Sequence, residues 1–113
     1  MTSPSPELHP SLWLELWTSL ASVLRSYTAV HGLNRKEQAT VELGPSQIIV
    51  RAGQRWLELN RREDQIRWSL EDLSHKKLGH GQMRFTIEGR LRMQDHEEEM
   101  DLQAEAWARE LMQ

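Results

Sequence analysis

The sequence predicts an α+β fold in which an N-terminal helix, a five-stranded antiparallel β-meander and a C-terminal helix follow one another. Three observations support this prediction: an apolar stripe of helical period over residues 11–31, alternating apolar and polar positions over residues 39–93, and a second helical stripe near the C-terminus. Side chains of a strand point to opposite faces in turn, whereas a helix returns to one face every three or four residues. We expect both helices to pack on the apolar face of the sheet.

The clearest strand signal lies in residues 82–93, whose sequence is QMRFTIEGRLRM. One set of alternate positions is apolar apart from Gly89, and the positions between them are mostly charged. The apolar residues are Met83, Phe85, Ile87, Leu91 and Met93. We therefore expect one long strand with an apolar face on the core and a charged face on the other side. Gly89 would mark a bend or bulge in this strand.

The first helix is expected over residues 11–31. Ser11 follows Pro10 and is placed to cap the first turn with its hydroxyl group. Gly32 is placed to end the helix in a left-handed conformation. The apolar stripe consists of Trp13, Leu16, Trp17, Leu20, Val23, Leu24, Tyr27 and Val30. Such a stripe is typical of a helix that packs on one side only.

Four shorter strands are expected before the long one, at residues 39–43, 47–51, 55–60 and 65–70. Short polar turns separate them, and short connections favour antiparallel pairing between neighbours. The side chains expected to face the core are Ile48, Val50, Leu57, Leu59, Ile66, Trp68 and Leu70. A slip of one residue in the register would exchange Trp56 with Leu57 between the two faces.

Residues 71–81 include the sequence SHKKLGHG and are expected to form a flexible basic loop, with a short helix as the alternative. The second helix is expected to begin near Asp95. Asp95 and Glu98 have the spacing of a capping box, and the neighbouring acids suit the positive end of a helix dipole. The apolar stripe of this helix consists of Met100, Ala104, Trp107, Ala108 and Leu111.

The chain of 113 residues predicts a single α+β domain over residues 11–113, preceded by a disordered tail over residues 1–10 that is rich in Ser and Pro. The absence of cysteine excludes disulfides and thiolate metal sites, and it fits a reducing compartment. No apolar run approaches the roughly 20 residues that cross a bilayer. No Lys or Arg precedes Arg25, so the basic start of a signal peptide is missing. We therefore expect a soluble cytoplasmic protein with no membrane partner.

The formal net charge of −3 is unevenly distributed along the chain. Residues 34–94 hold twelve Lys and Arg against eight acids, whereas residues 95–113 hold one Arg against seven acids. The negative total argues against a strongly basic nucleic-acid binder. A basic middle and an acidic end can neutralise each other, or each can face a different partner.

The charged face of the predicted sheet is the main candidate for a function, because Trp56 is expected there among basic residues. The candidate interface residues are Ile49, Arg51, Trp56, Arg67, Arg84, Arg90 and Arg92. An aromatic residue among cations suits a protein partner or a second copy of the chain. It also suits single-stranded nucleic acid, through phosphate contacts and base stacking. The simplest alternative is a solvated face with cross-strand Arg–Glu pairs.

No sequence motif predicts an enzyme. The chain lacks a nucleophile elbow, a phosphate-binding loop of the Walker type and an HExxH motif. His96 and Glu99, one turn apart in the expected second helix, are weak candidates for a divalent metal, and a third ligand would have to come from another element. Capping of the helix explains the same acids without a metal. No cofactor is predicted.

The order of helix, antiparallel meander and helix is similar to that of frataxin-like domains. In that family an acidic metal-binding ridge lies chiefly on the first helix, whereas residues 11–31 contain only Glu15 as an acid. The metal function is therefore not carried over. The sequence predicts a small non-enzymatic interaction module that binds a protein partner or itself, as a homodimer, through the outer sheet face. The alternatives are binding of single-stranded nucleic acid at the Arg-rich face and weak binding of a metal or small ligand.

Overall fold

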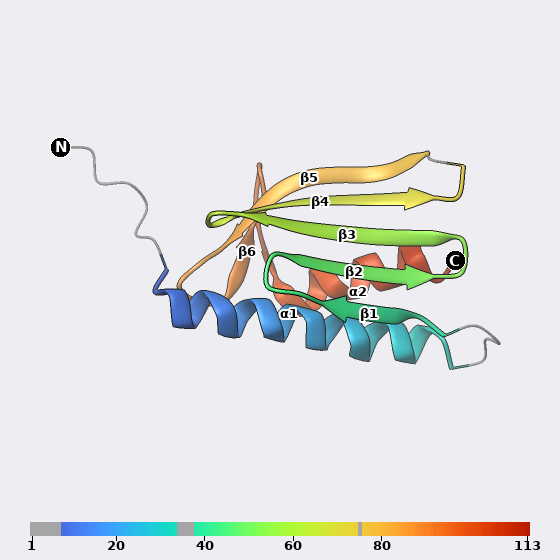
Figure 1. The fold of residues 1–113 in the computed structure, drawn as a ribbon, viewed down its shortest axis with the longest axis horizontal. Helices are drawn as coiled ribbons and strands as arrows, with labels where there is room; N and C mark the ends of the chain where they lie inside the picture. Colours follow the sequence, from blue (N-terminus) through green and yellow to red (C-terminus); the bar gives the residue numbers. More distant parts are fainter. Residues whose placement is uncertain (1–7, 34–37, 75) are drawn as a thin grey trace.

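The computed structural model describes residues 8–33, 38–74 and 76–113, so most of the predicted tail over residues 1–10 lies outside the described residues. Within these ranges the chain forms two helices and an antiparallel sheet, which confirms the predicted α+β class, but the sheet has seven strands instead of five. In chain order the elements are α1 (Pro10–His31), β1 (Thr40–Leu43), β2 (Gln47–Ala52), β3 (Arg55–Arg62), β4 (Gln65–Asp72), β5 (Lys77–Phe85), β6 (Arg90–Arg92), β7 (Glu97–Glu99) and α2 (Met100–Leu111). The strands lie in chain order from β1 at one edge to β7 at the other, and most of them can be followed beside α1 in Figure 1.

The long helix α1 begins at Pro10, one residue before the expected start. Its N-cap is His9, whose Nδ1 accepts a hydrogen bond of 3.1 Å from the backbone amide of Ser11, so the prediction of Ser11 as the cap is wrong. Proline suits the first turn because no helical hydrogen bond is lost there. The helix ends before Gly32 as expected, but Gly32 has a φ of −98° and is not left-handed.

The central strands β2, β3 and β4 begin where the sequence predicts and extend one or two residues further. Leu57 pairs with Val50 on one side and with Leu70 on the other, and all three side chains are buried. Trp56 lies on the opposite face of β3 because neighbouring residues of a strand alternate. The register slip that would exchange Trp56 with Leu57 has therefore not occurred.

The single long strand predicted over residues 82–93 is wrong, because the chain folds back as a hairpin. Strand β5 ends at Phe85 and β6 begins at Arg90. The backbone amide of Thr86 donates a hydrogen bond of 2.8 Å to the carbonyl oxygen of Arg90, which closes the turn. Gly89 has a φ of +81°, in the left-handed region that glycine adopts at little steric cost.

The hairpin keeps the alternation that suggested a continuous strand. Phe85 pairs with Leu91 and Arg84 pairs with Arg92, and both pairs are separated by an even number of residues. Paired residues lie on the same face of a sheet, so Phe85 and Leu91 are both buried, as a single strand would also place them. Only Ile87 reveals the difference, because it lies in the turn and is 60% exposed.

Residues 71–81, of which residue 75 lies outside the described residues, were expected to form a flexible loop or a short helix, but most of the described ones belong to strands. Strand β4 continues to Asp72, and β5 begins at Lys77, with a register shift between β4 and β5. The Oδ1 atom of Asp72 accepts hydrogen bonds from the backbone amides of Ser74 and Lys76, at 2.9 Å and 3.2 Å. This carboxylate therefore organises the tight connection between the two strands.

The glycines of this segment make room for an indole ring. Trp68 of β4 lies against Gly79 and Gly81 of β5, and a Cβ atom built on Gly81 would be 2.8 Å from the Trp68 Nε1. On Gly79 the corresponding distance to the ring is 3.2 Å. Trp68 in turn packs against Trp107 of α2, with ring centroids 5.5 Å apart. The glycines thus belong to the packing of the sheet rather than to a loop.

The second helix begins five residues later than expected, at Met100. Residues Glu97–Glu99 form β7, which pairs with β6. The N-cap of α2 is Glu99, and its side chain makes no capping hydrogen bond. The capping box predicted for Asp95 and Glu98 is therefore wrong.

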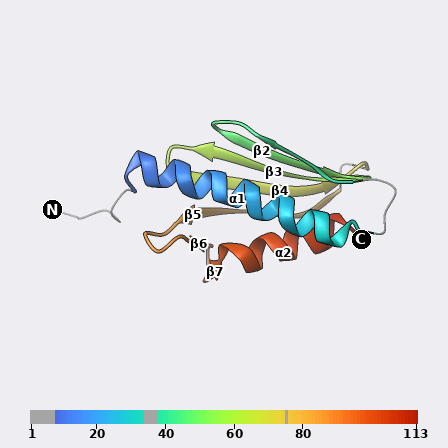
Figure 2. The same ribbon diagram turned by 90° about the horizontal axis from the view of Figure 1, so that it is seen from below.

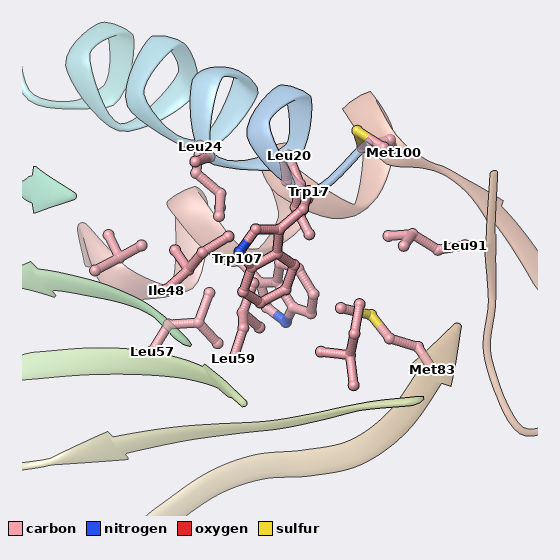
Figure 3. Packing of buried hydrophobic residues seen from close by; sticks show 14 of the residues in the cluster. Trp17, Leu20, Leu24, Ile48, Leu57, Leu59, Met83, Leu91, Met100 and Trp107 are labelled. Atoms are coloured by element: carbon pink, nitrogen blue, oxygen red, sulfur yellow. The ribbon is translucent and has the colours of Figure 1, made fainter. Parts of the chain in front are cut away.

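A buried cluster joins α1, α2 and the alternate residues of the strands (Figure 3). Its fully buried large side chains include Trp13, Trp17, Leu20, Leu24, Ile48, Leu57, Leu59, Ile66, Leu91 and Leu111. The rings of Trp13 and Trp17 stack with centroids 5.1 Å apart. The Trp17 Nε1 donates a hydrogen bond of 2.8 Å to the carbonyl oxygen of Gly44, which ties the β1–β2 turn to α1.

The two helices also contact each other, and Figure 2 shows them side by side next to the sheet. Their C-terminal ends meet where a Cβ atom on Gly32 would be 3.0 Å from the Cε of Met112. Neither helix in the described residues combines the length and the apolarity that a membrane span requires.

We expect the substitution Gly81→Ala to lower the free energy of unfolding by about 1–3 kcal/mol, the usual effect of overpacking a core. The added methyl group would meet the Trp68 ring at 2.8 Å. Gly79→Ala should destabilise less, because its closest approach is 3.2 Å. Urea unfolding followed by tryptophan fluorescence measures both variants. In a Trp68→Leu background the effect of Gly81→Ala should shrink, and an unchanged effect there would show that the ring is not the cause.

Candidate functional site

The polar face of the sheet consists of the strand residues that alternate with the buried ones. The buried cluster takes its members from the other face of the sheet and from both helices. Along β3, for example, Leu57 and Leu59 are buried, whereas Glu58 between them is only half-buried and Asn60 is exposed. The candidate interface residues of the strands lie on this polar face.

One end of the polar face combines an aromatic residue with an ion pair. Trp56 pairs with Arg51 of β2 on one side and with Glu71 of β4 on the other. The Nη1 atom of Arg51 lies 2.9 Å from the Oε1 atom of Glu42, and both side chains are more than half exposed. Trp56 itself is half-buried. In the cross-strand row next to that of Arg51, Trp56 and Glu71, Ile49 is half-buried and pairs with Glu58.

The middle of the face carries a row of amides around one arginine. Gln47, Asn60, Arg67 and Gln82 follow one another across strands β2 to β5 as successive cross-strand partners. The Nε2 atom of Gln47 donates a hydrogen bond of 2.8 Å to the Oδ1 atom of Asn60. This row is polar along its whole length and contains no carboxylate.

Two adjoining hollows lie along this row, and together we call them the amide–arginine groove. The larger hollow, of about 510 Å³, is lined by Asn60, Arg67, Ser69, Lys77, His80 and Gln94, among others. The smaller hollow, of about 190 Å³, is lined by Gln65, Arg84, Arg92 and Met93, among others. Gln82 and Gln94 line both hollows, so the two hollows lie next to each other. Among the described lining residues there is no Asp or Glu.

The structure divides the predicted interface residues into three sets. Ile49, Arg51 and Trp56 lie at one end of the polar face, whereas Arg67, Arg84 and Arg92 line the amide–arginine groove. Arg90 stands apart from both, because it pairs with Glu99 on β7 and lines neither hollow.

Sequence reasoning missed the amides Asn60, Gln65, Gln82 and Gln94 of the groove. Three of them lie on the polar positions of strands that were predicted, so alternation was the signal that could have placed them. Uncharged polar residues give no charge pattern and no known motif, and their common role becomes visible only when the strands are paired.

The metal candidates His96 and Glu99 do not share a helical turn. His96 precedes β7, and Glu99 ends it. The Nδ1 atom of His96 lies 2.7 Å from the Oδ1 atom of Asp95 instead. No group of three or more His, Asp or Glu residues that could hold a metal ion occurs in the part of the chain that the structure describes.

This contact has an electrostatic consequence. The hydrogen bond from His96 is the largest cause that lowers the pKa of the Asp95 carboxyl group below its ordinary value of 3.8. A carboxyl group with a lowered pKa in the folded state adds stability above its unfolded pKa and loses it as the pH falls through its folded pKa. The contribution is small because both side chains are more than half exposed.

We expect His96→Ala to raise the pKa of Asp95 toward its ordinary value, because the hydrogen bond and the nearby positive charge are both removed. NMR titration of the side-chain carboxyl carbons measures this pKa. Asp72 is the matched control, since its pKa is lowered chiefly by the hydroxyl group of Ser74 and should not change. An unchanged Asp95 pKa in the variant would show that the two groups do not interact.

A third hollow of about 200 Å³ lies where the start of α1 meets the end of β5, and it adjoins the smaller hollow of the groove because Arg84 and Arg92 line both. The rest of its lining is mostly apolar but includes two carboxylates: Leu8, Trp13, Phe85, Thr86, Ile87, Asp64 and Glu88. The guanidinium carbon of Arg61 lies 3.6 Å from the centre of the Trp13 ring, and the Nε1 of Trp13 is buried without a hydrogen-bond partner among the described residues. This hollow can accept a small apolar group.

Comparison of the chain with protein-family models, with curated proteins and with solved structures found no match.

Proposed function

We propose that the protein is a non-enzymatic binding module that holds a protein partner on the polar face of its sheet, and that it acts in the cytoplasm. Ile49 and Trp56 carry this proposal. Both lie on the polar face, and neither is one of the buried residues that form the core cluster in the described part of the chain. Apolar side chains placed outside the core, beside an arginine, are typical of the centre of a protein interface.

Charges at this end of the face favour a protein over a nucleic acid. Glu42, Glu58 and Glu71 are cross-strand neighbours of Ile49 or Trp56. A phosphate backbone that stacked its bases on Trp56 would approach these carboxylates and be repelled. A protein surface can match alternating positive and negative groups residue by residue, which gives specificity.

A second copy of the chain is the simplest partner of this kind, because most soluble oligomers are homo-oligomers. The net charge of −3 opposes self-association only weakly at physiological salt. Single-stranded nucleic acid remains the alternative ligand, supported by Arg67, Arg84 and Arg92 in the groove.

Photocrosslinking in cells tests the proposed function. A benzophenone amino acid at Arg51, on the polar face, should give a discrete adduct with a protein, whereas the same group at the exposed Ser22 of α1 should not. Trp56→Ala should reduce the adduct at least tenfold, since aromatic centres of interfaces contribute about 2 kcal/mol or more. Leu14→Ala, which truncates a 52% exposed apolar residue of α1, is the matched control and should leave the adduct unchanged.

Equal adducts from both positions, or an adduct that survives Trp56→Ala in a variant with unchanged thermal unfolding, would reject the proposal.

A further inference from the structure

We propose that the amide–arginine groove binds an extended acidic peptide segment of the protein partner. This inference rests on the proposed function, since it assigns the chemistry of the ligand at one part of the same face. Arg67 and Arg84 of the groove lie in other cross-strand rows than Trp56, although Lys77 at the edge of the groove pairs with Glu71 beside Trp56. Substitutions at Arg67 and Arg84 can therefore test the groove separately from Trp56.

The first support is charge. Arg67, Lys77, Arg84 and Arg92 line the groove, and no carboxylate does so among the described lining residues. This is unusual in a chain that contains 17 acids and 14 Lys and Arg. Arg67 and Arg84 form no salt bridge with another described residue. Their guanidinium groups are therefore available for the two oxygen atoms of a carboxylate.

Arg92 has a weak partner that a ligand can replace. Its Nη1 atom lies 3.8 Å from the Oε2 atom of Glu97, and the Arg92 side chain is 64% exposed. Exposed ion pairs of this kind contribute little, about 0–1 kcal/mol. An incoming carboxylate can therefore compete with Glu97 for Arg92.

The second support is the amides. Asn60, Gln65, Gln82 and Gln94 each offer an NH₂ donor and a carbonyl acceptor. A peptide backbone also carries a donor and an acceptor at nearly every residue, so amide side chains can satisfy both groups. A phosphate oxygen only accepts hydrogen bonds and would leave the amide acceptors unused. The combination of arginines and amides thus matches a peptide with carboxylate side chains.

Two features disfavour a nucleic acid in the groove. Trp68 is the only Phe, Tyr or Trp among the described lining residues of the groove, and its ring packs against Trp107 and the glycines of β5 instead of offering a free stacking surface. Residues 95–113 hold seven acids against one Arg, and this negative segment repels a long polyanion more than a short peptide. The larger hollow, of about 510 Å³, has the size of sites that hold small ligands or short segments, about 300–1,000 Å³.

Fluorescence anisotropy with defined probes tests the inference. The probes are a fluorescein-labelled ten-residue peptide of alternating Glu and Ser, its Gln–Ser counterpart, and a fifteen-nucleotide oligo-dT. The Glu–Ser peptide should bind at least tenfold more tightly than the Gln–Ser peptide at 20 mM salt, and more tightly than oligo-dT. The double variant Arg67→Gln/Arg84→Gln should weaken this binding at least tenfold.

The matched control is Arg25→Gln/Arg109→Gln, which also removes two positive charges, but from the exposed surfaces of α1 and α2. It should change binding by less than twofold. An equal loss of peptide affinity in both double variants would show that only net charge matters, and it would overturn the inference. Tighter binding of oligo-dT than of the Glu–Ser peptide would also overturn it. Amide NMR shifts caused by the peptide should centre on Gln82 and Gln94, and shifts centred elsewhere would also overturn it.

The two proposals fail in different ways. In one outcome, Trp56→Ala abolishes the adduct at Arg51, but Arg67→Gln/Arg84→Gln leaves peptide binding unchanged. This outcome would support the proposed function and reject the acidic-peptide groove. In the other outcome, peptide binding depends on Arg67 and Arg84, but the protein gives no adduct at Arg51. This outcome would support the groove as a site for an anionic peptide and reject the protein interface proposed around Trp56.

Discussion

The fold depends on burying several indole rings between the helices and one face of the sheet. Trp13 and Trp17 stack within α1, and Trp107 of α2 packs against Trp68 of β4. Each such aromatic pair adds about 0.5–1.5 kcal/mol beyond the burial of its area. Because these large rings and their aliphatic neighbours occupy the alternate strand positions on one face, the charged and amide residues must lie on the other. The same packing that builds the core therefore arranges the candidate binding face.

Sequence patterns predicted the central strands well because burial imposes a strict period of two. Leu57 and Leu59 could be placed inside, and Asn60 outside, by alternation alone. The hairpin between Phe85 and Leu91 could not be recognised, since pairing residues an even number apart gives the same alternation as one strand. The acids of β7 were assigned to a helix because carboxylates at a helix start and carboxylates on an exposed edge strand give the same local signal.

The candidate site was predicted only in part. The arginines Arg67, Arg84 and Arg92 were assigned to the polar face, but their common groove depends on how β4, β5 and β6 pair. The amides that surround them were missed because they leave no pattern of charge or hydrophobicity. His96 and Glu99 were grouped on the assumption of a helix that begins five residues further along the chain.

The meander also dictates an order of assembly. Every strand hydrogen-bonds to its immediate neighbours in the chain, so the sheet can form by consecutive local closures, which are entropically cheap and fast. The contact between the helices is not local in this sense, because all the strands lie between Gly32 and Met112 in the sequence. During synthesis α1 leaves the ribosome first, yet it meets α2 only after residues 100–112 have been made. The C-terminal turn of α1 around Gly32 therefore gains its contact with Met112 only at the end of this order.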